Sequence, residues 1–227
     1  MIDVNTFYKK INNSNFESQL DDINNNLSMF MDRENYNVNY RESYIIQSHF
    51  QSEKSVADEY AIAKNNIPFR KEEWICKLAV GKTFEVIGEI VDYQVPLKVP
   101  GQKSDGRGKV DLLSYSKETN TAYLLEVKVD TSTESPLKAI MEVYTYWQQI
   151  GGNNSEKFLS KTIIGCNAKL KKAIIIFEND EKRYLFSKLK KNDAKLKCLM
   201  NKLDIECFVA ETSLQDENVI SSIRRYK

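Results

Sequence analysis

Residues 108–130, GKVDLLSYSKETNTAYLLEVKVD, give the strongest structural signal in the sequence. Two apolar segments flank the polar turn at 117–120, a pattern that predicts a β-hairpin. Closing the hairpin at this turn sets Asp111 opposite Glu126. Because side chains alternate along a strand, Lys128 falls on the same face as both carboxylates. The hairpin is therefore expected to gather two acids and a lysine at one end.

Two directly opposed carboxylates in apolar surroundings predict a cation between them, because like charges repel across a sheet. The carboxylates of Asp111 and Glu126 and the main-chain carbonyl of Val127 are the hard oxygen ligands that Mg²⁺ prefers, with Mn²⁺ as the alternative ion. Lys128 would then orient or deprotonate an attacking water and offset charge on a phosphate. The residues therefore predict a metal site with positions left for water and a phosphate oxygen.

Working outward, the flanking segments predict further helices and strands. The expected elements are a helix at 71–80, a strand at 86–97, a polar loop at 101–108, a helix at about 136–150, a buried strand at 172–178, a helix at 182–203 and a strand at 206–211. This order predicts an α/β fold, an open mixed β-sheet flanked by helices.

The amino-acid composition of the chain changes near residue 66. Residues 1–66 are rich in Asn and acidic side chains, with apolar residues at helical intervals, and are expected to form an N-terminal helical extension of unknown role. Residues 67–227 carry the excess of basic side chains and are expected to form the main domain. A lysine-rich helix there, which includes Lys195, is either a phosphate-binding surface or a solvated face.

Composition excludes several classes of protein. The net charge is +1, and the single histidine, His49, leaves little room for a histidine-ligated metal centre or a Ser/His/Asp triad, because its sequence neighbours offer it no partner. Four widely spaced cysteines form no zinc-binding pair. No apolar run reaches the roughly 20 residues of a membrane span, and no secretory signal is visible, so we expect a cytoplasmic protein without a membrane partner. The oligomeric state is not indicated.

Asp111, followed by the Glu126-x-Lys128 motif at the end of an apolar strand, resembles the PD-(D/E)xK nuclease superfamily. The element order over residues 70–211 is similar to the αβββαβ core of this restriction-endonuclease-like fold. The resemblance implies that Asp111 and Glu126 bind the metal and that Lys128 is the catalytic lysine. Val110 stands where the proline of the family motif would be, which removes no chemical group from the site.

Other residues take roles from the same resemblance. A glutamate of the first core helix often completes the metal site, and Glu73 is the expected candidate, with Glu72 and Glu85 as rivals. Glu142 and Tyr146 have the spacing of a Gln-x-x-x-Tyr motif found in exonuclease-like members, with Glu in place of Gln. From their positions in the sequence, Lys103 and Arg107 in the polar loop are further candidates for contact with backbone phosphates, and Gln94 in its strand either touches substrate or pairs at a sheet edge.

The function expected from these residues is that of a Mg²⁺-dependent nuclease acting on nucleic acid. DNA is favoured over RNA because it is the commoner substrate in the family that the chain resembles. The alternative is a non-catalytic nucleic-acid- or protein-binding module that retains the nuclease fold, for example in a defence or mobile-element system. The presence of Asp111, Glu126 and Lys128 together favours the enzyme. An enzyme acting on small nucleotides is a third reading.

Overall fold

The computed structural model describes residues 7–12, 15–25, 71–97, 108–129, 132–150, 152, 155–160, 162–178, 184–213, 216 and 218–227. Lys103, Arg107 and most of the expected N-terminal extension lie outside these residues. No helix in the described part of the chain is long and apolar enough to cross a membrane.

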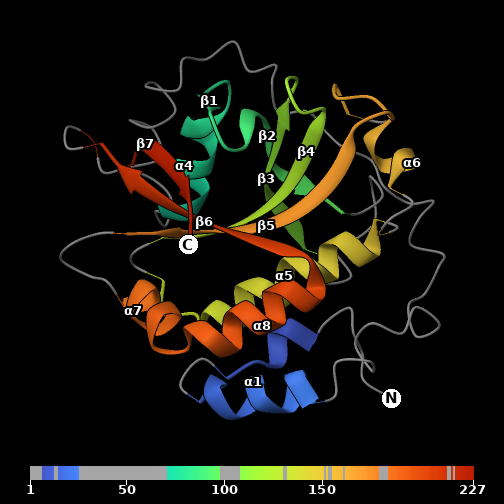
Figure 1. Ribbon diagram of the computed structural model, residues 1–227. Helices are drawn as coiled ribbons and strands as arrows, with labels where there is room; N and C mark the ends of the chain where they lie inside the picture. The colour runs from blue at the N-terminus through green and yellow to red at the C-terminus, as the bar shows by residue number, and fades with distance from the viewer. Residues whose placement is uncertain are drawn as a thin grey trace.

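Seven strands form one mixed sheet, and their order across the sheet is their order in the sequence (Figure 1). They are β1 (Thr83–Phe84), β2 (Gly88–Pro96), β3 (Lys109–Ser116), β4 (Thr121–Lys128), β5 (Lys169–Phe177), β6 (Ile205–Thr212) and β7 (Ile220–Arg225). Neighbouring strands are antiparallel except for the pairs β4–β5 and β5–β6, which are parallel. Helices make these two crossovers, as parallel pairing requires.

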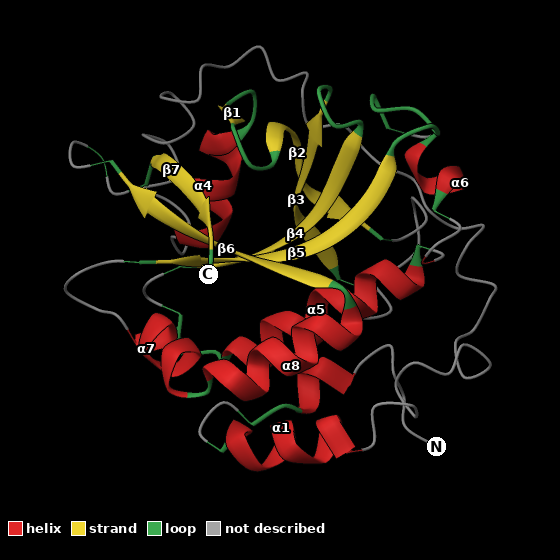
Figure 2. Cartoon of the chain, viewed as in Figure 1, coloured by secondary structure: helices red, strands yellow, loops and turns green. Residues whose placement is uncertain are grey.

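Helices cover both faces of the sheet (Figure 2). They are α1 (Phe16–Asn25), α4 (Lys71–Ala79), α5 (Pro136–Gln149), α6 (Glu156–Leu159), α7 (Tyr184–Lys191) and α8 (Asp193–Leu203), preceded by the 3₁₀ turn η1 (Phe7–Lys10). One apolar core lies between the sheet and α5, α7 and α8, and a second lies between the sheet and α4. The expected single helix at 182–203 is two helices, which meet at Asn192.

The prediction of an open, restriction-endonuclease-like sheet is wrong. The sheet curls around α4 until it nearly closes into a barrel (Figure 1). Each strand adds a right-handed twist, and irregularities between Ile90 and Asp92 and between Glu211 and Thr212 add local bends. Strands β1 and β7, which the sequence did not predict, extend the sheet at both edges. Helix α4 packs against both β2 and β7 and so bridges the opening.

Part of the expected N-terminal extension packs against the main domain. Helix α1 buries Phe16, Leu20 and Ile23 in the same core as α5 and α8. Its acidic side chains pair with the basic helices, and the Asp21 carboxylate lies 2.7 Å from the Lys195 ammonium. This lysine of the predicted basic surface therefore has an internal partner.

Candidate active site

The β3–β4 hairpin positions the acidic residues. Its register runs from Leu112 opposite Leu125 to Ser116 opposite Thr121, which confirms the predicted register. The next position outward sets Asp111 opposite Glu126. Here the backbone N–H of Val127 donates to the side chain of Asp111, at Oδ2 over 2.9 Å, rather than to the backbone of β3. The Asp111 carboxylate thus takes part in the pairing at the end of the hairpin.

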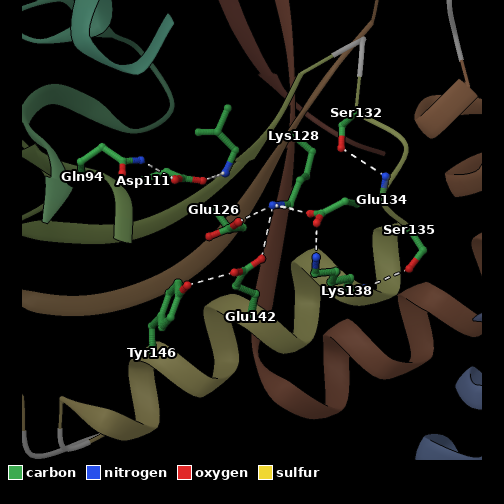
Figure 3. Close-up of polar contacts among 11 residues, drawn as sticks. Gln94, Asp111, Glu126, Lys128, Ser132, Glu134, Ser135, Lys138, Glu142 and Tyr146 are labelled. Atoms are coloured by element: carbon green, nitrogen blue, oxygen red, sulfur yellow. Dashed lines mark hydrogen bonds and ion pairs between the residues drawn. The ribbon is translucent and has the colours of Figure 1, made fainter. Parts of the chain in front are cut away.

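Gln94 on β2 holds the other oxygen of the same carboxylate. Its Nε2 donates to Asp111 Oδ1 over 2.9 Å (Figure 3). The backbone of Gln94 has a φ of 48°, a left-handed conformation that costs a residue other than glycine roughly 1–3 kcal/mol. A strained residue at this place aims its amide at Asp111. The residue predicted to touch substrate therefore positions an acid in the free protein.

Lys128 lies at the centre of the site. Its side chain is only 5% exposed, and its Nζ lies 2.6 Å from Glu126 Oε1, 2.9 Å from Glu134 Oε2 and 3.3 Å from Glu142 Oε2 (Figure 3). An ammonium has three N–H donors, so the three carboxylates engage all of them. Burial alone would lower the pKa of Lys128, but the charges of Glu126 and Glu142 raise it well above its usual value.

Helix α5 brings a third acid to this lysine. The helix begins at Pro136 after the cap Ser135, whose Oγ accepts from Lys138 N over 3.2 Å. Glu142 lies one turn after Lys138 in the helix, and its carboxylate reaches Lys128 on β4 (Figure 3). The structure therefore brings the predicted residue Glu142 into the cluster.

Tyr146 supports Glu142 from the next turn of α5. Its hydroxyl donates to Glu142 Oε1 over 2.9 Å. Gly108 lies against this hydroxyl with a φ of 83°, and a Cβ there would come within 2.5 Å of it. A glycine is therefore required beside Tyr146. Tyr146 therefore acts on the cluster through Glu142.

The acids at the hairpin end are not fully compensated. Glu126 Oε2 is buried and accepts no hydrogen bond when Glu126 is ionised, whereas the protonated acid can share its proton with Asp111 or Glu142. Burial, followed by the charges of Asp111 and Glu142, raises the pKa of Glu126 well above its usual value. Burial also raises the pKa of Asp111 to about 6, although Lys128 and the Val127 N–H oppose this change. The cluster therefore holds more carboxyl groups than one lysine can balance if all of them are ionised.

Helix α4 contributes Glu72 rather than Glu73. Glu73 is exposed, as is its rival Glu85. Burial and the charge of Asp111 raise the pKa of Glu72 to about 8. The adjoining thiol of Cys76 is fully buried, and its pKa is raised well above the usual value, first by burial and then by Asp111. The acidic cluster therefore extends from the hairpin to α4.

Sequence reasoning missed Glu134, which precedes the cap of α5. A signal was present, because Glu134 and Lys138 have the i, i+4 spacing of an ion pair, and the structure pairs them. The structure also sets Glu134 against Lys128. Sequence spacing alone does not reveal that contact.

The donor set agrees with a metal ion in one respect and not in another. The orphaned Glu126 oxygen beside Asp111 is a hard donor that a divalent cation would satisfy. Among the residues that the structure describes, however, no group of three or more His, Cys, Asp or Glu side chains is arranged to hold a metal ion. Two carboxylates, with water and substrate oxygens, are the ligands that this arrangement offers.

Comparison with known proteins gives no match. No family model matches the sequence, and searches of curated proteins and of solved structures find no significant similarity.

Proposed function

We propose that the chain is a cytoplasmic, Mg²⁺-dependent nuclease that hydrolyses phosphodiester bonds at the Asp111–Glu126–Lys128 cluster. The observation that carries this proposal is the buried, unpartnered Oε2 of Glu126 next to a second buried carboxylate. Buried polar atoms in folded proteins nearly always have a partner, and an exception needs an explanation, such as a bound water or ion or a role in function. A divalent cation supplies the charge that the cluster lacks.

The residues that would hold the ion are Asp111, Glu126 and the main-chain carbonyl of Val127, with Glu72 nearby. When bound, Mg²⁺ lowers the pKa of a coordinated water and stabilises charge on a phosphate oxygen. Mn²⁺ takes the same oxygen ligands. The positive charge of the ion would also favour the ionised forms of Asp111 and Glu72, whose pKa values of about 6 and about 8 are raised by burial.

Lys128 supplies the second positive charge of the proposed site. Its ammonium would offset the charge that develops on the attacked phosphate. Glu142, supported by Tyr146, fixes the lysine from the side of α5. Gln94 fixes Asp111 from β2. DNA is proposed as the substrate in preference to RNA because the motif resembles that of the PD-(D/E)xK nucleases.

A second candidate function is a non-catalytic nucleic-acid- or protein-binding module. Two observations favour it: all three donors of Lys128 engage carboxylates, and no three-ligand metal group is found in the described residues. Under this alternative the cluster is a structural ion network.

Cleavage assays separate the two functions. The purified chain would be incubated with labelled single- and double-stranded DNA and RNA in Mg²⁺, Mn²⁺ or chelator. The expected result is cleavage of DNA in either metal and none in chelator. Glu126→Gln keeps the shape of the side chain but removes the anionic oxygen, and we expect it to reduce the cleavage rate by roughly 10²-fold or more.

The matched control is Glu206→Gln, which changes a carboxylate at the other end of the sheet and should leave the rate unchanged. Cleavage that survives chelation would overturn the metal mechanism. Binding of nucleic acid without cleavage in any divalent metal would establish the module instead.

A further inference from the structure

Glu134 bridges two lysines in the free protein. One carboxylate oxygen, Oε2, lies 2.9 Å from Lys128 Nζ, and the other, Oε1, pairs with Lys138 Nζ (Figure 3). A carboxylate held by two ammonium groups presents the same charge and the same pair of acceptor oxygens as one edge of a phosphate. The two lysines therefore define an anion position beside the acidic cluster.

The start of α5 adds to the positive character of this position. Lys138 is the third residue of the helix, and the first turn contains no acidic side chain. A cation there opposes the helix dipole, which favours anions at an N-terminus, so the dipole does not account for Lys138, and the ion pair with Glu134 is the stabilising contact that the structure gives it. Its placement is explained if it serves an anion.

Glu134 is the carboxylate best able to leave Lys128. Its side chain is 28% exposed, whereas those of Glu126 and Glu142 are 3% and 13% exposed. It also lies outside the strand and helix that fix the other two acids. An incoming anion would therefore displace Glu134 before it displaced the others.

We propose that Lys128 and Lys138 form the subsite for the scissile phosphate, and that Glu134 occupies it until substrate arrives. The identity of the substrate rests on the proposed function. Displacement frees one N–H donor of Lys128 for the phosphate and turns Lys138 into a second phosphate ligand. Lys138 is thus a binding residue that the nuclease motif does not include.

The test measures binding without cleavage. A short labelled DNA duplex would be titrated in Ca²⁺ and followed by fluorescence anisotropy, and inorganic phosphate would be titrated as a competitor. Lys138→Ala should weaken binding of the duplex about tenfold or more, the size of a lost charge-assisted contact. Lys138→Arg should retain it within about threefold, because the charge remains. Glu134→Gln should tighten it about three- to tenfold, because the internal competitor loses its charge.

The matched control is Lys197→Ala on α8, which removes a lysine of another i, i+4 ion pair, with Asp193. It should bind as the wild type does. Equal loss in Lys138→Ala and Lys197→Ala, weaker binding by Glu134→Gln, or no binding of duplex or phosphate by the wild type would each overturn the subsite. Because Glu134→Gln predicts a gain, the test does not depend on the folding of Lys138→Ala.

The outcome is separable from that of the proposed function. A wild-type protein that binds the duplex but cleaves nothing in Mg²⁺ or Mn²⁺ would end the nuclease proposal. The subsite would still be decided by the affinities of the Lys138 and Glu134 variants.

Discussion

The charged cluster around Lys128 and a second cluster around Glu206 lie at opposite ends of the parallel strands and combine the same groups in opposite proportions. Glu206 Oε1 lies 2.6 Å from Lys171 Nζ, the other oxygen pairs with Arg225, and the Tyr123 hydroxyl donates to the same carboxylate. Burial would raise the pKa of Glu206, but Lys171 and Arg225 hold it below its usual range.

The comparison separates a stabilising ion network from a site that needs a further partner. At Glu206 one half-buried carboxylate meets two cations, and the charged form is favoured. At Lys128 one lysine meets several carboxylates, and burial raises the pKa values of Glu126 and Asp111. pKa values that are shifted so as to disfavour the charged form are common at functional sites. The predictions below test this contrast in order of decreasing effect.

The largest expected difference is in stability on loss of the lysine. Lys128→Ala leaves several buried acids without their cation and should lower the free energy of unfolding by about 3–5 kcal/mol. Lys171→Ala removes a partly exposed partner of a carboxylate that keeps Arg225, and should lower it by at most about 1 kcal/mol. Urea unfolding at neutral pH in chelator measures both values. An equal loss of unfolding free energy in the two variants would contradict the difference between the two clusters.

Magnesium should stabilise only one of the two clusters. At an ion concentration 100 times its dissociation constant, the gain for the wild type is about 2.7 kcal/mol. Asp111→Asn should abolish most of this gain, whereas Glu206→Gln should keep it. Scanning calorimetry with and without Mg²⁺ gives the difference. A melting temperature that does not respond to Mg²⁺ would count against a preformed metal site.

The pH dependence should have opposite signs at the two ends. The raised pKa values of Asp111 and Glu72, about 6 and about 8, mean that their contribution to stability is present at low pH and is lost as the pH rises toward about 8. The lowered pKa of Glu206 gives a contribution that is lost as the pH falls through its folded value.

In chelator the wild-type protein should therefore lose stability between about pH 5 and about pH 8. Glu72→Gln should flatten the upper part of this slope, and Glu206→Gln should not change it. Thermal unfolding in a series of buffers provides the measurement. A flat profile in the wild type would show that the acids are not coupled to folding.

The smallest effect is expected at the exposed pairs between α1 and α8. Both partners of the Lys195–Asp21 pair are about half exposed, so Lys195→Ala should cost about 0.2–1 kcal/mol. Because Lys195 already has Asp21 as a partner, its removal should change the affinity for DNA by less than about twofold. Anisotropy at low salt tests this. A large loss would restore α8 as a phosphate-binding surface.

The local part of the structure was predictable from the sequence. The four-residue turn at 117–120 fixes the β3–β4 register, and the register brings Asp111, Glu126 and Lys128 together. The choice between Glu72 and Glu73 was not predictable in this way, because it depends on the rotation of α4 about its axis. The contact of Glu134 with Lys128 was not predictable either, because it joins the end of β4 to the residue before the cap of α5 in space.

The shape of the sheet was mispredicted because twist accumulates over the whole sheet. No single strand of the sequence encodes the near closure. Strand β7, with the sequence ISSIRR, lacks the apolar run that marks a buried strand. Strand β1 has two residues, too few for any periodicity. Both edge strands were missed, and the open sheet followed from their absence.

The position of α4 has a consequence for the order in which the chain folds. Each strand pairs with its neighbour in sequence, so the sheet can grow strand by strand as the chain leaves the ribosome. Ile75 of α4, however, shares its core with Ile220 and Ile223 of β7, nearly 150 residues later. Helix α4 can pack against β2, β3 and β4 as soon as they form, but the core that it shares with the sheet is completed only when β7 joins, after the hairpin that holds the acidic cluster has formed.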